Sequence, residues 1–252
     1  MFSSIRICYL IILFPILLLS DEAPLKIMPL GDSITYDSNH DDKYVSPRPV
    51  GVRNGYRNDL WYKLIAAGFH VDFVGSQQAG QSIVPRFDVD NEGHPGWTSY
   101  QIAYNIYTYL IYNTPDIILL HIGSNDNASS VAGVEYLLDE IDRFEEDNGH
   151  HITVIVALII DRNPHSPTVS AFNHNLKNLV KQRIAEGDDL MLVDMQYGAG
   201  IQYSRDMADH IHPNDRGYAK MANVWFKAIV DYKKNHSNYI NILIPIYNLL
   251  MN

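Results

Sequence analysis

The chain has 252 residues, of which 46% are hydrophobic, 11% aromatic and 19% charged. These proportions are typical of one globular domain, or at most two small ones, and they exclude a disordered, collagen-like or coiled-coil protein. Nineteen Lys and Arg against 29 Asp and Glu give a net charge of −10. A nucleic acid is therefore not an expected partner, because neutralising phosphates requires a basic face.

The first twenty residues have the anatomy of a secretory signal peptide. Arg6 supplies the positive charge, Ile7–Leu19 is an apolar run, and Ser20 is a small residue at a plausible cleavage point. The run is shorter than the roughly 20 residues of a membrane span. An uncleaved anchor is the alternative, because no Ala-x-Ala precedes the cut. We expect residues 1–20 to be removed, together with Cys8, the only cysteine, and the mature protein to be secreted and extracellular without stable membrane association.

Five apolar runs of strand length follow, with segments of helical spacing between them. The expected strands are Leu25–Leu30, Val71–Gly75, Asp116–Ile122, Ile152–Ile159 and Leu190–Met195. Their centres are continuously apolar, as in strands that helices cover on both faces. No linker divides the chain, so residues 21–235 are expected to form one domain. The alternation predicts a three-layer α/β/α fold around a five-stranded parallel sheet with right-handed crossovers.

Three helix start signals support this alternation. Thr98 and Gln101 have the spacing of a capping box, Ser166 stands before Pro167, and Asn214 precedes the last amphipathic segment. In parallel sheets of this kind, active sites lie beyond the carboxyl ends of the strands. The residues that directly follow the expected strands are therefore the first candidates for chemistry.

A serine follows the first expected strand, in Gly31-Asp32-Ser33. A catalytic serine needs a base within hydrogen-bond reach and a third group that orients the base. Asp209 stands three residues before His212, where its carboxylate can accept the Nδ1 proton and leave Nε2 facing outward. For Ser33, a helix N-cap is the alternative interpretation. For the second segment, the alternative is a metal site formed by Asp206, Asp209, His210 and His212.

An asparagine follows the third expected strand, in Gly123-Ser124-Asn125-Asp126. Its amide can donate to the negative charge that develops on a carbonyl oxygen during acyl transfer. An Asx-turn or a helix cap is the alternative. A second donor is expected from a backbone N–H within residues 93–98, where glycines let the chain approach a ligand closely.

Four blocks of the sequence together resemble a known superfamily. The blocks are Gly31-Asp32-Ser33, Gly96-Trp97-Thr98, Gly123-Ser124-Asn125-Asp126 and Asp209-x-x-His212, and their order resembles that of the SGNH, or GDSL-type, hydrolases. The resemblance spans Leu25 to about Lys234 and implies a flavodoxin-like fold. It implies Ser33 as nucleophile, His212 as base and Asp209 as its partner. It also implies an oxyanion hole formed by the Ser33 and Gly96 N–H groups with the Asn125 side chain, without a metal or an organic cofactor.

Three further segments, residues 54–61, 71–76 and 92–97, are similar to carbohydrate esterase family 3. Members of that group are acetyl xylan esterases, so the resemblance implies an acetylated carbohydrate as substrate. The candidate substrate-binding residues are Asp32, His94, Trp97 and Arg57. For His94 we expect a structural or substrate-wall role, and a second catalytic base is the alternative. For Arg57 the alternative is an exposed position on a helix. A lipid or aryl esterase, or a catalytically inactive sugar-binding protein, is the alternative function, and we expect a monomer.

One segment departs from the family pattern, and a second has no expected role. Residues 38–53 form a long polar loop that we expect to border the site and to influence which leaving group is accepted. Residues 236–252 form an apolar tail to which the sequence assigns no role. Asn127 and Asn235 stand in glycosylation sequons.

Overall fold

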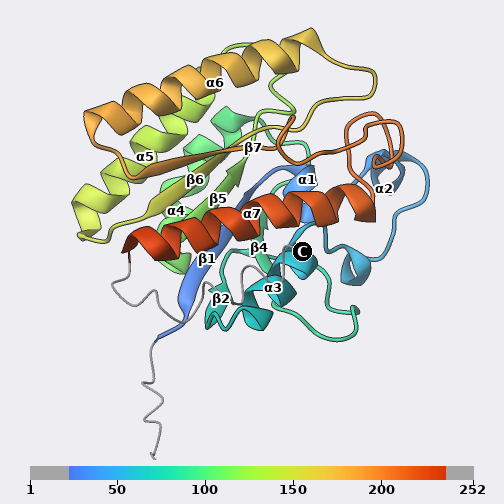
Figure 1. Ribbon diagram of the computed structural model, residues 1–252, viewed down its shortest axis with the longest axis horizontal. Helices are drawn as coiled ribbons and strands as arrows, with labels where there is room; N and C mark the ends of the chain where they lie inside the picture. Colours follow the sequence, from blue (N-terminus) through green and yellow to red (C-terminus); the bar gives the residue numbers. More distant parts are fainter. Residues whose placement is uncertain (1–22, 237–252) are drawn as a thin grey trace, which may run out of the picture.

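A sheet of seven strands lies between two layers of helices (Figure 1). The computed structural model describes residues 23–236, so the predicted signal peptide and the tail from residue 237 onward lie outside the described residues. The strands are β1 (Leu25–Gly31), β2 (Val71–Phe73), β3 (Gln77–Gln78), β4 (Asp90–Gly93), β5 (Ile117–His121), β6 (Thr153–Leu158) and β7 (Leu190–Asp194). The α-helices are α1 (Ser33–Tyr36), α2 (His40–Tyr44), α3 (Arg57–Ala66), α4 (Ser99–Asn113), α5 (Ala132–Asn148), α6 (Pro167–Glu186) and α7 (Asp215–His236). A 3-10 turn, η1, spans Val50–Val52.

The strand order brings the ends of three strands together. The sheet runs β3-β4-β1-β5-β6-β7, and β2 also pairs with β1. β3 is antiparallel to β4, and the other pairs are parallel. At the end of β1, Gly31 lies opposite Gly93 of β4 and His121 of β5. The chain therefore leaves β1, β4 and β5 at one edge of the sheet, where a parallel α/β fold places its site.

All five predicted strands are present and parallel to their neighbours, but the sheet has seven strands rather than five. The sequence pattern missed β3 and β4 because both are polar. In β4, Asn91 and Glu92 are fully buried. The Asn91 amide donates to the carbonyls of Gln77 and Val89, so hydrogen bonds to its neighbours replace the apolar packing that a strand pattern normally reveals.

Successive residues of each strand point to opposite helix layers, because side chains along a β-strand alternate between the two faces of the sheet. Ile27, Ile117 and Ile155 pack in one core with Leu60 of α3 and Trp225 of α7. A second core lies beneath α4, α5 and α6. It is formed by the strand residues that point to the other face of the sheet, including Met28, Ile118, Val154 and Val156. Figure 1 shows α7 crossing the first face with α3 beside it.

The three predicted helix start signals are confirmed. Thr98 and Gln101 exchange both bonds of a capping box before α4, and the Ser166 hydroxyl accepts from a backbone N–H in the first turn of α6. The Asn214 side chain accepts from N–H groups in the first turn of α7. Because each cap stands at the sheet edge that carries the site, these bonds also fix where the loops before the helices lie.

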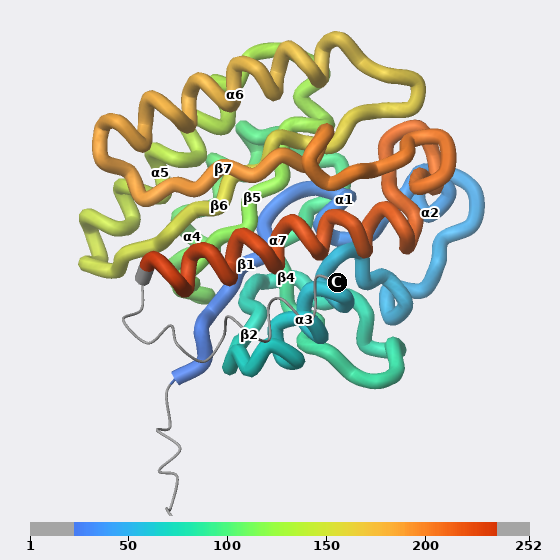
Figure 2. Tube along the Cα trace, in the orientation of Figure 1, coloured from blue at the N-terminus to red at the C-terminus, as the bar shows by residue number. Residues whose placement is uncertain are grey.

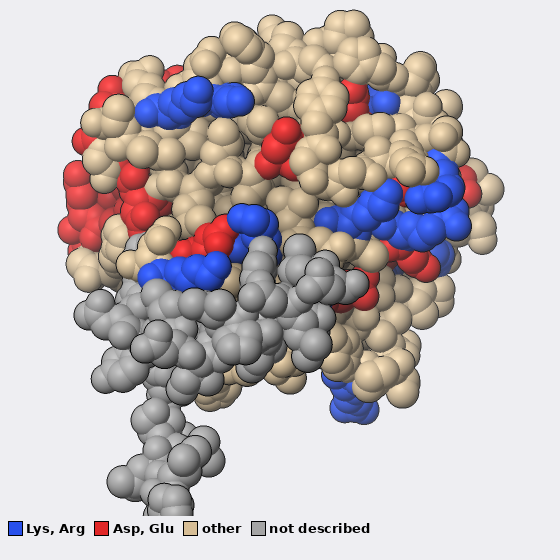
Figure 3. All heavy atoms as spheres, viewed as in Figure 1, with Lys and Arg blue, Asp and Glu red and all other residues tan. Residues whose placement is uncertain are grey.

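Two distant segments meet beside that edge. Figure 2 shows α2 lying next to the loop that precedes α7, and the backbone N–H of His40 donates to Asp209 at 2.8 Å. On the face drawn in Figure 3, Asp and Glu gather where α5 ends, whereas Lys and Arg gather beside α2 and the beginning of α7. The excess negative charge is thus unevenly distributed. Among the helices within residues 23–236, none has the length and apolar character needed to cross a bilayer.

Candidate active site

Ser33 stands at the beginning of α1, directly beyond the end of β1. The N-cap of this single-turn helix is Asp32, whose side chain accepts from the Ile34 N–H at 2.9 Å. The Ser33 hydroxyl is therefore not used as the cap, unlike in the alternative interpretation. Gly31 is required here, because a Cβ would lie 2.3 Å from the His121 carbonyl oxygen. This close approach of β1 to β5 sets the height of Ser33 above the sheet.

The structure brings His212 and Asp209 to Ser33. The Ser33 Oγ lies 2.9 Å from His212 Nε2, and His212 Nδ1 lies 2.8 Å from Asp209 Oδ2. Since a carboxylate oxygen can only accept, the Nδ1–H donates to Asp209 and leaves Nε2 as an acceptor toward the serine hydroxyl. This is the geometry that a nucleophile, its base and the group orienting the base require.

Backbone donors hold the Asp209 carboxylate in place. Its Oδ1 accepts from the N–H groups of Ile211 and His212, and its Oδ2 accepts from that of His40. Burial acts to raise the pKa of Asp209, but the hydrogen bonds from His212 and His40, with that from Ile211, hold it well below its ordinary value. The carboxylate therefore stays ionised at neutral pH and keeps a negative charge behind the imidazole.

Asp206 stabilises the segment before α7 through hydrogen bonds and is not part of a metal site. It is fully buried, and its carboxylate accepts from Lys220 at 2.6 Å and from the Gln202 N–H at 2.8 Å. These bonds lower its pKa well below the usual range. His210 Nδ1 is 2.5 Å from the Asn163 carbonyl oxygen. In the part of the chain that the structure describes, no three His, Cys, Asp or Glu residues are placed to hold a metal ion.

The expected oxyanion donors face the same cleft as Ser33. The cleft has a volume of about 530 Å³, and Gly96 and Asn125 both line it. The Asn125 amide nitrogen donates to the Trp97 carbonyl oxygen at 2.9 Å, and Asp32 Oδ2 is its second, more distant acceptor at 3.4 Å. Gly96 has φ +85, and a Cβ added there would meet no atom within 4 Å beyond its chain neighbours. Glycine is therefore favoured at this position by the positive φ angle, and not because a neighbouring group leaves no room for a side chain.

A buried histidine–carboxylate pair lies beneath the segment that carries Gly96. His94 Nε2 is 2.5 Å from Glu92 Oε1, and Glu92 also accepts from the N–H and hydroxyl of Ser76, both at 2.7 Å. The imidazole is stacked between Trp97, at 4.2 Å between ring centres, and Tyr109, at 5.1 Å. These contacts fit a structural role for His94.

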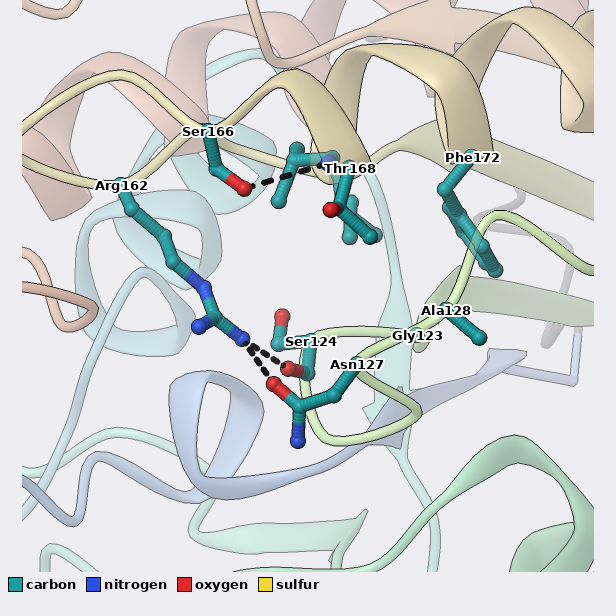
Figure 4. Close-up of a pocket in the computed structure, with 10 residues that line it drawn as sticks. Gly123, Ser124, Asn127, Ala128, Arg162, Ser166, Thr168 and Phe172 are labelled. Atoms are coloured by element: carbon teal, nitrogen blue, oxygen red, sulfur yellow. Dashed lines mark hydrogen bonds between the residues drawn. The ribbon is translucent and has the colours of Figure 1, made fainter.

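Two further contacts fix the loop that carries Asn125. Asp126 accepts from the Ser99 hydroxyl at 2.5 Å, which ties the loop to the beginning of α4. Arg162 donates to the Ser124 carbonyl and to the Asn127 side chain, across a small pocket of about 80 Å³ (Figure 4). Since the Asn127 amide also donates to the Asn125 carbonyl at 3.0 Å, the loop is held from both sides.

Asp32 lies buried beneath the cleft. Its Oδ2 is 3.4 Å from the Asn125 amide nitrogen. Burial raises the pKa of Asp32 to about 6, although the Ile34 N–H and the nearby His212 act in the opposite direction. A carboxylate with this pKa changes its charge within the range in which an enzyme works.

None of the four candidate substrate-binding residues lines the cleft, which corrects the expectation from the sequence. Asp32 and Arg57 are fully buried, His94 is buried in its stack, and Trp97 packs against His94. Arg57 is not exposed, and no carboxylate within residues 23–236 pairs with it. Its guanidinium donates to the backbone carbonyls of Thr35, Arg53, Ala79 and Val89. Burial lowers the pKa of Arg57 to about 10, so it remains charged.

The loop of residues 38–53 borders the cleft, as predicted. Ser38, Asn39, His40, Lys43 and Tyr44 line the cleft from this loop, and His210 and Ile211 line it from the segment that carries the candidate base. Arg48 fixes the loop by donating to Asp37 at 2.9 Å and to Asp42 at 2.7 Å. The side chains that face a substrate thus come from a part of the chain where the sequence shows only polarity, without a motif.

Comparison with known proteins defines the class of this site. Residues 27–225 match the GDSL-like Lipase/Acylhydrolase family, and the chain belongs to that family. The protein is a carboxylic ester hydrolase of the SGNH type.

Three of the similar proteins are named as esterases. The chain is similar to a family 3 carbohydrate esterase of Clostridium thermocellum, with 32% identity and a TM-score of 0.69 over 84% of this chain and 98% of that one. An acetyl esterase, whose serine-to-alanine mutant was determined with an acetate ion, is 26% identical, with a TM-score of 0.70 over 84% and 100% of the two chains. A multidomain esterase of Ruminococcus flavefaciens is 28% identical over 85% of this chain, which spans only 30% of that protein.

Proposed function

We propose that this protein is a secreted serine esterase that removes O-acetyl groups from carbohydrate, such as acetylated xylan or a related plant-wall polysaccharide. The observation that carries the proposal is the continuous series Ser33–His212–Asp209, with contacts of 2.9 and 2.8 Å, beside two oxyanion donors in one cleft. The similarity to a carbohydrate esterase and to an acetyl esterase supports the substrate class. Secretion rests on the signal-peptide pattern of residues 1–20.

In the proposed mechanism, His212 Nε2 accepts the hydroxyl proton as Ser33 Oγ attacks the acetyl carbonyl carbon. The ionised Asp209 stabilises the imidazolium that forms. The negative oxygen of the tetrahedral intermediate accepts from the Ser33 N–H, the Gly96 N–H and the Asn125 amide. His212 then returns the proton to the sugar oxygen, and the carbon–oxygen bond to the sugar breaks.

The second half of the reaction repeats the same proton transfers with water. His212 takes a proton from a water molecule as its oxygen attacks the acetyl group on Ser33. Collapse of the second intermediate breaks the bond to Ser33 Oγ, which regains the proton from His212, and acetate leaves. Each group is used twice, so no side chain beyond those in the cleft is needed for proton transfer.

The cleft lining favours a short acyl group over a long one. A lipid esterase binds its acyl chain in a tunnel of aliphatic side chains. Ile211 is the one aliphatic side chain that lines the described cleft, whose other lining residues are polar, aromatic, imidazole, proline or glycine.

Acetate release from acetylated xylan tests the proposal, with the wild type compared with Ser33→Ala and with short- and long-chain aryl esters as further substrates. We expect the wild type to deacetylate xylan and the short ester, and the variant to do neither. Turnover of long-chain esters alone would retain the serine mechanism and reject the carbohydrate substrate. A folded wild type that is inert on every ester would point to the inactive sugar-binding alternative.

A further inference from the structure

One face of α2 forms part of the cleft rim. His40, Lys43 and Tyr44 line the cleft, and positions i, i+3 and i+4 of a helix lie on the same side. Contacts lead from the candidate triad to this face. The His40 N–H donates to Asp209 at 2.8 Å, the rings of His40 and Tyr44 are 4.9 Å apart, and Lys43 Nζ is 4.9 Å from the centre of the Tyr44 ring.

The direction of proton transfer places the departing sugar near His212. The acetyl oxygen must point at the donors of Gly96 and Asn125. The sugar oxygen must be near His212, because it receives its proton from that ring. His40, Lys43 and Tyr44 line the same cleft as Ser33 and His212, so their face is a surface that the departing sugar can contact. Tyr44 is 65% exposed there, with His40 and Lys43 beside its ring.

Lys43 places a positive charge on this face of the cleft. No ion pair within residues 23–236 includes Lys43. Asp42, on another side of α2, has a fully buried side chain paired with Arg48. Asp41 is exposed and does not line the cleft, although its Oδ1 is 3.6 Å from His40 Nδ1. An exposed carboxylate outside the cleft is screened by solvent, so its effect on Lys43 is weak.

We propose that this face of α2 binds the sugar that loses its acetyl group, and that Lys43 selects acetylated carbohydrates that carry a carboxylate, as in a uronic acid, next to that sugar. The inference rests on the proposed esterase function and adds the charge of the substrate to it. With a net charge of −10, the protein as a whole repels an acidic polymer. A cation inside the cleft offsets that repulsion where the polymer must approach most closely.

The test compares two substrates that differ only in charge. Acetylated xylo-oligosaccharides with a glucuronic acid branch and the same oligosaccharides without it are hydrolysed by the wild type, by Lys43→Gln and by Lys43→Glu. The readout is the ratio of kcat/KM on the acidic substrate to kcat/KM on the neutral one. Lys177→Gln, which removes an exposed charge on α6 far from the cleft, is the matched control. Ser33→Ala establishes that the measured acetate comes from this site.

We expect the wild-type ratio to exceed one, to fall about threefold to fivefold in Lys43→Gln, as for the loss of one exposed ion pair, and to fall further in Lys43→Glu. The preference should shrink at high ionic strength, and the control should match the wild type. A ratio at or below one in the wild type, or one that Lys43→Gln leaves unchanged, overturns the inference. If neither oligosaccharide releases acetate while aryl acetate is still cleaved, the proposed carbohydrate function fails instead.

Discussion

Two histidine–carboxylate pairs lie at the sheet edge that carries Ser33, and their surroundings differ. The side chains of His212 and Asp209 are 12% and 20% exposed at the cleft, whereas those of His94 and Glu92 are 9% and 0% exposed. Asp209 binds Nδ1 of its histidine and leaves Nε2 to Ser33. Glu92 binds Nε2 of His94, and the rings of Trp97 and Tyr109 stack on that imidazole.

The difference shows that residue type alone does not decide which pair does chemistry. What distinguishes the pairs is which ring nitrogen the carboxylate occupies and whether the other faces a reacting atom. The His212 pair is placed to move a proton. The His94 pair supports the backbone through Trp97, whose carbonyl orients the Asn125 amide, and through the His94 N–H, which donates to the Gly31 carbonyl.

The largest expected effect is the loss of kcat when the base of the His212–Asp209 pair is removed. His212→Gln should lower kcat on aryl acetate by about 10³-fold or more, because Ser33 loses its base. The free energy of unfolding should change by less than about 1 kcal/mol, because the ring lies at the cleft surface. His174→Gln, an exposed position on α6, is the control. Retention of a tenth of the wild-type kcat would contradict the assignment of the base.

Removing the Asn125 amide, which Trp97 orients, should have the next largest effect. Asn125→Ala should lower kcat by about 10² to 10³-fold with little change in KM, because the donor acts on the charge of the transition state. Initial rates over a range of aryl acetate concentrations measure both constants. A rise in KM with an unchanged kcat would instead make Asn125 a substrate-binding residue.

A paired substitution sharpens the comparison itself. Asp209→Asn should lower kcat strongly and should also cost some stability at neutral pH, because the hydrogen bonds that lower the pKa of Asp209 favour the ionised carboxylate in the folded state. Glu92→Gln should lower kcat only about tenfold but reduce the free energy of unfolding by about 1 to 3 kcal/mol, because buried donors of Ser76 and His94 lose a charged acceptor. Urea unfolding and steady-state kinetics on both variants test this. Equal effects of the two substitutions on both quantities would remove the distinction between the pairs.

Replacing Asp32 should change stability by an amount that depends on pH. Burial raises the pKa of Asp32 to about 6, so the folded state binds this proton more tightly than the unfolded state does. The stability that Asp32 contributes is complete below about pH 3.8 and is lost as pH rises toward 6. Asp32→Asn should therefore gain on the wild type by about 3 kcal/mol across that window and keep this lead above it. Urea unfolding at a series of pH values measures the difference, and a constant difference would contradict it.

The sequence predicted the triad geometry because its parts are local or follow from topology. The Asp209–His212 spacing gives a short-range contact, and Ser33 and Asn125 each follow a parallel strand, so the sheet edge brings them together. It did not reveal Glu92 or the role of Arg57, because both are buried polar groups. The partners of Arg57 are carbonyls as far apart as Thr35 and Val89, which only the folded chain brings together.

The bond from the His40 backbone to Asp209 has a consequence for how this site can change. The α2 side chains that line the cleft, His40, Lys43 and Tyr44, are free to vary, since they face solvent and substrate. The backbone is not free, because one main-chain hydrogen of α2 helps to hold the carboxylate behind the candidate base. A loop transplanted from a relative to alter substrate preference must keep an N–H at that point, and a proline there would alter the rate as well as the preference.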